Sequence, residues 1–536
     1  MSIAGNPAFR YAFGIESGLF NRAQQQNLRR KSSEKISTIL GLGLLSVAFL
    51  TACGKEEVGS TTDYDTISIL SPYIETEPPA SDNEILKQLE AYTGKNIDIT
   101  WAPNTSYEDK MNITLASDDI PEVMVIQGKS GGFIKSAENG AFWDLTDYLA
   151  DYPNLSQSNE DVLRNSSVNG KVYGIYRKRD AMRTAVIIRK DWLENLNLDV
   201  PETIDDLYEV AKAFTENDPD GNGENDTFGL IIPQWPGSIN SNSPYDVLAT
   251  WFGAGNAWKE IDGTLEPSFM QPEYLESMQF VKDMVEQGYV NRDFATMAAD
   301  KWDEPFINGR GGIIIDTYSR AAQISNKLLQ AGEEDLVVFT GNLKDNSGTM
   351  NALPTDGYSG FLAIPKSSVQ TEEHLKEVLT FLDKLNDKEA QVLLNNGIEG
   401  INFEVVDGMS VALEGSEAEA LANAVKGYSQ IGMNVTEDTL YYIAKPDTEA
   451  ATESYEKRLS LMEADLEHAV FNPAASYNTD TYVTKGAQLD QIISDARVQF
   501  IAGQIDEAGW EAAIELWKNQ GGTQLMEETN ALHQAQ

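Results

Sequence analysis

An acidic, glycine-containing segment carries the oxygen ligands that a calcium ion prefers. Its side chains with oxygen atoms recur at alternate positions: Asp218, Asp220, Asn222, Glu224 and Asp226. They match positions 1, 3, 5, 7 and 9 of a calcium-binding loop, and Gly223 takes position 6, where the sharp turn needs a residue without Cβ. Position 12, normally a bidentate glutamate, is Gly229. The segment therefore predicts either an unconventional calcium loop or a surface turn that holds no ion.

Three arginines close together in the sequence form a second candidate site. Arg177, Arg179 and Arg183 occur in a chain whose formal net charge is −44. Guanidinium groups bind carboxylates and phosphates through paired hydrogen bonds. We expect these arginines either to bind a carboxylated or phosphorylated ligand or to form ion pairs with the protein's own acidic residues.

Several aromatic residues follow predicted strands or lie in predicted loops, where a sugar could stack on them. Sugars present flat C–H faces to aromatic rings. The candidates are Trp101, Trp235, Trp251, Trp258, Trp302 and Tyr318. For any one of these tryptophans, packing in the core is as good an interpretation as ligand stacking. The remaining tryptophans lie within helical patterns and are predicted to be core residues: Trp143, Trp192, Trp510 and Trp517.

Two common motifs of enzymatic chemistry are missing from the sequence. It contains no His-Glu-x-x-His and no phosphate-binding loop motif. The three histidines, His374, His468 and His533, are too few and too scattered to predict a zinc site. Glycoside hydrolysis needs only two carboxylates, so residue types alone do not exclude a carbohydrate-active enzyme.

The N-terminal segment has the pattern of a secretion signal that ends in a single cysteine. Basic residues between 29 and 35 precede an apolar run at 39–49, which is followed by Leu-Thr-Ala and Cys53. A charged lead, a short apolar stretch and small residues before a cleavage point are typical of a secretory signal. The pattern resembles the lipobox of bacterial lipoproteins, which implies that Cys53 receives a fatty acid such as palmitate and becomes the N-terminus. A plain secretory signal is the alternative. The acidic remainder of the chain is expected to repel nucleic acid.

Strands and helices alternate after a polar tether at 53–62. Strands are predicted at 66–70, 97–101 and 122–126, with helices at 83–92 and 107–116 between them. Such alternation predicts an α/β fold with mostly parallel sheets flanked by helices, and ligands of such sheets lie beyond the carboxyl ends of the strands. Residues 203–206 read as a capping box before an amphipathic helix. The chain from about residue 440 onward is predicted to be mostly helical.

The order of these elements resembles the extracellular solute-binding lipoproteins of bacterial ABC importers, most closely the large carbohydrate-binding type with a type II periplasmic-binding-protein fold. The most specific pieces are the lipobox, the stretch 201–230 with its acidic loop, and residues 396–403, NGIEGINF. The resemblance implies two α/β lobes with a ligand cleft between them. It assigns residues 1–52 to the signal peptide, 63–176 plus 358–430 to lobe 1, and 177–357 plus 431–536 to lobe 2.

The resemblance also implies a function. The expected protein is held by its lipid on the extracellular face of the cytoplasmic membrane, binds a sugar or oligosaccharide, with a uronide as one candidate, and delivers it to an ABC permease. No organic cofactor is expected, and a structural Ca²⁺ ion is, because alginate-binding members carry a loop of this general kind. The two-lobe arrangement adds cleft candidates at Asp316, Tyr318, Arg320, Tyr358 and Glu399. Two alternatives remain open: a surface carbohydrate-active enzyme, and a peptide-binding or sensor lipoprotein on the same fold.

Overall fold

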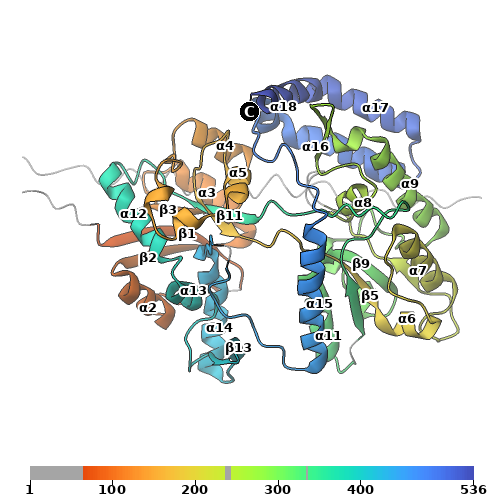
Figure 1. Cartoon of the computed structure of the whole chain (residues 1–536), viewed down its shortest axis with the longest axis horizontal. Helices are drawn as coiled ribbons and strands as arrows, with labels where there is room; N and C mark the ends of the chain where they lie inside the picture. The colour runs from red at the N-terminus through yellow and green to blue at the C-terminus, as the bar shows by residue number, and fades with distance from the viewer. Residues whose placement is uncertain (1–63, 76, 236–242, 334–335, 437, 536) are drawn as a thin grey trace, which may run out of the picture. The chain divides into compact units, whose positions relative to one another are not determined.

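In the computed structural model, which describes residues 64–75, 77–235, 243–333, 336–436 and 438–535, two β-sheets organise the chain (Figure 1). The first sheet has the order β2 (Asn96–Pro103), β1 (Thr66–Tyr73), β3 (Val123–Ile126), β11 (Tyr358–Ala363) and β4 (Ile175–Lys178). The second has the order β10 (Val337–Thr340), β5 (Thr184–Arg189), β9 (Gly311–Thr317) and β6 (Phe228–Leu230). The predicted signal peptide, Cys53 and the tether lie outside the described residues.

Two hairpins and a large set of helices complete the fold. The hairpins pair β7 (Trp258–Ile261) with β8 (Thr264–Pro267) and β12 (Phe403–Val406) with β13 (Met409–Ala412). The helices are α2 (Glu84–Thr93), α3 (Tyr107–Leu115), α4 (Gly131–Glu138), α5 (Glu160–Ser166), α6 (Lys190–Leu196), α7 (Ile204–Glu216), α8 (Pro244–Trp251), α9 (Pro272–Gln287), α10 (Glu304–Ile307), α11 (Tyr318–Gln330), α12 (Glu372–Lys384), α13 (Lys388–Asn395), α14 (Ser416–Tyr428), α15 (Glu449–Leu466), α16 (Asp480–Ile501), α17 (Glu507–Trp517) and α18 (Thr523–Gln534). Among the helices described, none is long and apolar enough to cross a membrane.

Both sheets are mixed, which refines the prediction of mostly parallel sheets. Strand β1 pairs in parallel with β2 and β3, and β6 pairs in parallel with β9. Strand β11 runs antiparallel to β3 and β4, and β5 runs antiparallel to β9 and β10. The antiparallel strand of each sheet, β11 in the first and β5 in the second, is the strand that the chain enters after leaving the other sheet. The chain enters at the edge of the sheet where the parallel strands end, so this strand runs in the opposite direction.

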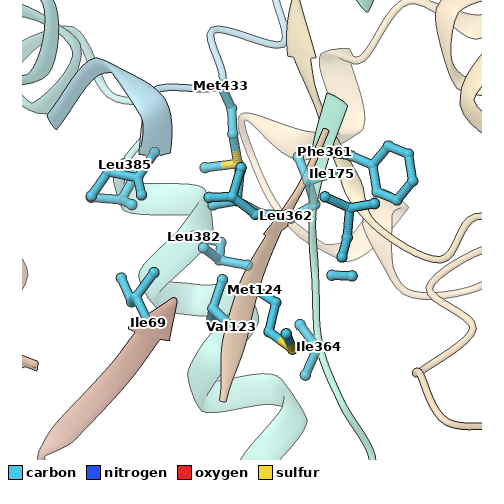
Figure 2. Close-up of a cluster of buried hydrophobic side chains, with 14 of the residues drawn as sticks. Ile69, Val123, Met124, Ile175, Phe361, Leu362, Ile364, Leu382, Leu385 and Met433 are labelled. Atoms are coloured by element: carbon cyan, nitrogen blue, oxygen red, sulfur yellow. The ribbon is translucent and has the colours of Figure 1, made fainter. Parts of the chain in front are cut away.

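The core of the first sheet is assembled from segments far apart in the sequence (Figure 2). Ile69 of β1, Met124 of β3 and Leu362 of β11 are fully buried next to Leu382 of α12. Met433 is 1% exposed in the same cluster. This core therefore continues past residue 430, where the sequence predicts a crossing. The predicted lobe boundaries themselves stay a prediction.

Helix α7 forms as its sequence predicts and fixes the second core. The Thr203 hydroxyl accepts a hydrogen bond from the Asp206 amide at 3.1 Å, and the Asp206 carboxylate accepts one from the Thr203 amide at 3.0 Å. This reciprocal pair is the predicted capping box. The predicted apolar face is buried throughout: Ile204, Leu207, Val210, Ala211 and Phe214.

Gly229 lets α7 approach the second sheet closely, and we expect Gly229→Ala to lower the free energy of unfolding by about 1–3 kcal/mol. A Cβ at this position would lie 2.5 Å from the Ala211 Cα and 2.6 Å from its carbonyl oxygen, so backbone would have to move. Urea denaturation midpoints of the two proteins measure the effect. Gly128→Ala is the control, because a Cβ there meets no atom within 4 Å. Equal loss in both variants would contradict the prediction.

The C-terminal helices contact elements of both sheets. Helix α16 packs on α9 and α17 and also on α4 of the first sheet. The Lys129 ammonium donates to the carbonyl oxygens of Asn165 at 2.6 Å and Ser167 at 3.2 Å, and to that of Ala475 at 2.7 Å. Trp510 and Trp517 are buried among these helices, as is Trp192 beside α7, which confirms the core prediction for these three tryptophans.

Candidate binding cleft

The two sheets are connected by chain segments that run side by side. Residues 179–183 lead from β4 to β5, and residues 354–357 lead back into β11. The Arg179 amide donates to the Gly357 carbonyl at 2.9 Å, and the Thr355 amide donates to the Ala181 carbonyl at 2.8 Å. A third segment joins them where the Lys178 amide donates to the Met433 carbonyl at 2.9 Å. Polar side chains on these segments are thereby held at the junction of the two sheets.

A cavity of about 340 Å³ lies at this junction. One wall comes from β4 and the first connection, and another from α13 and residues 429–434 and 439–441. Ser319 in the first turn of α11 contributes from the second sheet. Its polar lining residues include Arg177, Arg179, Arg183, Ser359, Asn395 and Tyr441. The cavity therefore lies beyond the carboxyl end of β4, as the sequence argument expects for a ligand of an α/β sheet.

Arg177 is held in place by neutral acceptors. Its guanidinium donates to the Ser359 carbonyl oxygen at 3.1 Å and to the Gln430 side-chain oxygen at 2.9 Å. Its Nε is buried, and no described residue accepts a hydrogen bond from it. Burial and the neighbouring charge of Arg179 lower the pKa of Arg177 to about 10, so this side chain is still cationic at neutral pH.

Arg179 and Arg183 extend the cationic surface toward the second sheet. The Arg183 guanidinium donates to the Ser319 hydroxyl at 3.3 Å. Burial and the charge of Arg183 lower the pKa of Arg179. Within the described residues none of the three cleft arginines pairs with a carboxylate, although Arg164, Arg189, Arg320 and Arg497 all do. Among the described residues, therefore, these three side chains do not form the internal ion pairs that the sequence left open as an alternative.

The cleft candidates of β9, α11 and β11 are placed differently. Asp316 and Arg320 form an ion pair with each other, and the Arg320 guanidinium lies over the Trp302 ring at 4.7 Å. The Tyr318 hydroxyl is buried without a hydrogen-bond partner among the described residues, and burial raises its pKa. Tyr358 is half-buried on β11, and burial raises its pKa also. Glu399 is exposed in the turn before β12, and the described contacts do not bring it to the cavity.

Two tryptophans proposed as ligand contacts belong to the core, which corrects that prediction for them. Trp251 is fully buried and donates its indole N–H to the Asn342 side-chain oxygen at 2.8 Å. Trp302 is 1% exposed and donates to the Ile231 carbonyl at 2.9 Å. Neither ring has a free face on which a sugar could stack.

The other three tryptophans retain some exposure but are not gathered at the arginine cavity. Trp101 packs its edge against Tyr428 with 5.6 Å between ring centroids. Trp235 packs against Trp302 at 5.7 Å. Trp258 lines a separate cavity of about 200 Å³ next to the C-terminal helices. Their roles as ligand contacts stay predictions.

The acidic loop adopts a turn in which its side chains face one another. The Asp218 carboxylate accepts hydrogen bonds from the Asn222 amide at 3.1 Å and the Gly223 amide at 3.0 Å. The Asn222 side-chain amide donates to Asp220 at 2.9 Å and to Asp226 at 3.3 Å. Among the described residues no group of three or more His, Cys, Asp or Glu side chains is arranged to hold a metal ion. Close packing of Gly229 on α7 explains why position 12 carries no side-chain ligand.

Several lining residues could not be recognised from the sequence. Ser359, Asn395 and Tyr441 are single polar residues in no motif, and they come from segments far from the arginines. The same is true of Gln430, which accepts a hydrogen bond from Arg177. The one signal that pointed to them was the predicted third crossing near residue 430.

Fold and cleft together define a class: two mixed sheets, joined by paired connections, with a polar cavity at their junction, as in two-lobed solute-binding proteins. The family model described as bacterial extracellular solute-binding protein matches residues 74–392. The chain belongs to this family.

Named relatives extend the match to most of the chain. Lipoprotein LipO of Bacillus subtilis strain 168 is 48% identical over 495 residues, covering 92% of this chain and 97% of LipO. The polygalacturonan/rhamnogalacturonan-binding protein YtcQ of the same strain is 32% identical, covering 84% of this chain and 88% of YtcQ.

Solved structures show the same fold at low identity. A solute-binding protein from Bifidobacterium longum infantis, described as binding HMO, superposes with a TM-score of 0.69 at 17% identity, covering 87% of this chain and 98% of that one. The Streptococcus pneumoniae protein FusA in complex with kestose gives 0.66 at 19% identity, covering 88% and 99%. The chain therefore shares the fold of proteins described as ABC-transporter substrate-binding proteins, and its family is that of the bacterial extracellular solute-binding proteins.

Proposed function

We propose that this protein captures an acidic oligosaccharide, a uronide, in the arginine cavity and delivers it to an ABC permease. The observation that carries the proposal is the set of Arg177, Arg179 and Arg183, which line the cavity without a carboxylate partner among the described residues. A ligand carboxylate would supply the bidentate acceptor that these guanidinium groups lack. The name of YtcQ, a relative that binds polygalacturonan and rhamnogalacturonan, supports the same ligand class.

The charge of the whole chain makes this cavity selective. With a formal net charge of −44, most of the surface repels an anionic sugar. A compact cationic cavity on such a surface binds anions only where the geometry suits the ligand, and that binding weakens as salt screens it.

Anchoring and release complete the proposed function. A fatty acid on Cys53 would hold the protein on the extracellular face of the cytoplasmic membrane, and the name lipoprotein given to LipO supports this. The solute would be bound and released without chemical change, since the relatives are named as binding proteins. Hinged movement of the two sheets about residues 179–183 and 354–357 would open and close the cavity.

Calorimetry with oligogalacturonates tests the proposal. The chain that starts after Cys53 retains the whole compact unit from residue 63 to 536 and is the protein to use. We expect binding of galacturonate oligomers that weakens with added salt, and much weaker binding of neutral oligomers such as fructo-oligosaccharides. Equal binding of neutral and acidic oligomers would overturn the uronide assignment, and turnover of any glycan would overturn the role as a binder.

We also propose that the acidic loop binds a structural Ca²⁺ ion. Asp218, Asp220, Asn222 and Asp226 supply hard oxygen atoms around one turn, which suits calcium. The side-chain N–H group of Asn222 lies between the carboxylates of Asp220 and Asp226. A calcium ion at the same position would be attracted by the two carboxylates more strongly than this neutral N–H group is. Rotation of that amide would turn its oxygen toward the ion. Water or a residue outside the loop would have to replace the ligand missing at position 12.

Calcium is then expected to raise the unfolding temperature in a concentration-dependent way. Binding to the folded state alone stabilises it by RT ln(1 + [L]/Kd), about 2.7 kcal/mol at one hundred times Kd. Thermal scans in a chelator and in millimolar Ca²⁺ measure the effect on the wild type and on an Asp220→Asn, Asp226→Asn double variant. The double variant should not respond. An unchanged wild-type melting temperature would show that the loop is a turn without an ion.

A further inference from the structure

The arginine cavity has two walls that differ in charge. The arginine wall, formed by β4 and the first connection, carries the guanidinium groups of Arg177, Arg179 and Arg183. The neutral wall comes from α13 and residues 429–434 and 439–441, and none of its described lining residues is charged at neutral pH. A ligand that fills the cavity therefore meets cations on one side and uncharged groups on the other.

Three side chains of the neutral wall have polar atoms that no described residue uses. The Asn395 side-chain amide donates to the Gln391 carbonyl oxygen at 3.0 Å, and its own oxygen accepts no described hydrogen bond. No described hydrogen bond involves the hydroxyl group of Thr439 or of Tyr441. Burial and the charge of Asp180 raise the pKa of the Tyr441 phenol, so it keeps its proton at neutral pH and can donate it in a hydrogen bond. Amide and hydroxyl groups of this kind suit the hydroxyl groups of a neutral sugar.

Tyr441 also supplies an aromatic surface to the cavity. It is the one aromatic residue among the described lining residues, and its side chain is half-buried. Sugars pack their flat C–H faces on aromatic rings. The ring belongs to the same wall as Asn395 and Thr439, so a sugar unit stacked on it lies against the neutral wall.

The two remaining charged residues of the lining do not make the neutral wall suitable for a carboxylate. Lys178 donates its ammonium to the Thr436 carbonyl oxygen at 2.8 Å, so it is engaged within the protein. Asp180 follows directly on Arg179, is exposed, lines the same cavity and forms no ion pair with a described residue. Its negative charge repels a second ligand carboxylate, which would also lose hydration without gaining a cationic partner.

Resting on the proposed function, we infer that the cavity binds a uronate unit on its arginine wall and a neutral sugar unit on its neutral wall. The ligand class is then a mixed acidic oligosaccharide, in which a uronate is joined to a neutral sugar. The cavity volume of about 340 Å³ fits a ligand longer than one sugar ring, since pockets for drug-sized ligands measure ~300–1,000 Å³. An oligogalacturonate still binds, through one of its units.

Calorimetry with monogalacturonate, digalacturonate and the disaccharide galacturonosyl-rhamnose, which carries one carboxylate, tests the inference. We expect wild-type protein to bind the mixed disaccharide about tenfold or more tightly than digalacturonate. Digalacturonate should bind about as tightly as the monomer, because its second unit stays outside the cavity. Thr439→Lys, which places an ammonium on the neutral wall, should reduce the preference for the mixed disaccharide over digalacturonate. Asp180→Asn should reduce it also, because the repelling charge is gone.

Two matched variants serve as controls. Thr439→Gln enlarges the same side chain without adding a charge and should keep the preference of the wild type. Thr105→Lys adds the same charge at an exposed residue that lines neither the arginine cavity nor the smaller cavity, and it should also keep the preference. Melting temperatures equal to that of the wild type show that each variant is folded.

The outcomes separate the inference from the function on which it rests. Wild-type protein that binds none of the three ligands overturns the proposed function and the inference together. Wild-type protein that binds digalacturonate as tightly as the mixed disaccharide, or more tightly, overturns the inference alone. An unchanged preference in folded Thr439→Lys and Asp180→Asn also overturns it, because the second sugar unit would then not lie at the neutral wall.

Discussion

Arg177→Gln is expected to weaken binding of a uronide by about 30- to 1,000-fold, which corresponds to ~2–4 kcal/mol. Arg177 has the most restrained guanidinium of the three cleft arginines, because Ser359 and Gln430 accept two of its hydrogen bonds and orient the rest. A ligand carboxylate bound there would lose its only fixed partner in the variant. Titration calorimetry with trigalacturonate gives the ratio of dissociation constants directly.

The pH dependence of the same binding has a definite sign. Arg177 loses its proton as the pH approaches its pKa of about 10, and a uronate carboxylate is ionised well below neutrality. Affinity should therefore be constant between about pH 6 and 8.5 and fall above that range. Arg177→Lys should keep part of the affinity, and Arg164→Gln, at an exposed surface ion pair, should keep all of it. Wild-type affinity in Arg177→Gln would remove the cavity from consideration as the ligand site.

Local patterns in the sequence predicted the elements of this fold well. The capping box at Thr203 and Asp206 and the apolar face of α7 are properties of neighbouring residues, so they survive in any tertiary context. Gly288, which ends α9 in a left-handed conformation, is a local signal of the same kind. Strand direction is different. That β5 and β11 are reversed follows from where the chain crosses between sheets, which alternation of strands and helices does not reveal.

The binding cleft could be predicted only in part, for a related reason. The three arginines were recognisable because they are adjacent in the sequence and cationic in an acidic chain. Whether they would pair internally depended on which carboxylates the fold brings near, and Asp180, although it lines the same cavity, forms no described ion pair with them. The tryptophans show the converse. Trp101, Trp251 and Trp302 were candidates by the same criterion, a place after a predicted strand or in a predicted loop. Only the packing of Asn342 against Trp251 and of Ile231 against Trp302 places those two rings in the core.

Buried charge is a second property that the sequence does not reveal. Asp490 of α16 is 7% exposed, and it lines the smaller cavity together with Lys129 and Asp356. The Tyr482 hydroxyl donates to it at 2.9 Å. In the sequence Asp490 is one of many acidic residues on an amphipathic helix, and nothing distinguishes it from Asp495, which is exposed five residues later. The difference between these two side chains is a matter of which face of α16 packs against its neighbours and which face is exposed to solvent.

Asp490→Asn is expected to increase the free energy of unfolding by about 1–3 kcal/mol at pH 7.5. Burial, with a contribution from the charge of Asp246, raises the pKa of Asp490 to about 6, although the hydrogen bond from Tyr482 lowers it somewhat. Its value in the unfolded chain is near 3.9. At pH values between these two pKa values, Asp490 binds its proton more tightly in the folded protein than in the unfolded chain. The contribution of Asp490 to the free energy of unfolding therefore falls as the pH rises from the lower pKa to the higher one. The asparagine keeps an oxygen for Tyr482 and never ionises.

The pH profile distinguishes this cause from a change in packing. The stability difference between Asp490→Asn and the wild type should be largest at pH 7.5 and shrink as the pH is lowered to 4.5, where the folded wild type carries the neutral acid. Urea denaturation at both pH values measures it. Asp495→Asn, on the exposed face of the same helix, should differ from the wild type by no more than about 0.5 kcal/mol at either pH. A difference that is independent of pH would indicate a change in packing. A less stable Asp490→Asn at pH 7.5 would mean that the ionised carboxylate is compensated by a partner, for which Lys129, lining the same cavity, is a candidate. The Lys129 ammonium also links the first sheet to the segment before the C-terminal helices. In that outcome, attraction between Asp490 and Lys129 across the cavity would stabilise the contact between the C-terminal helices and the first sheet, and the buried carboxylate would not lower the free energy of unfolding.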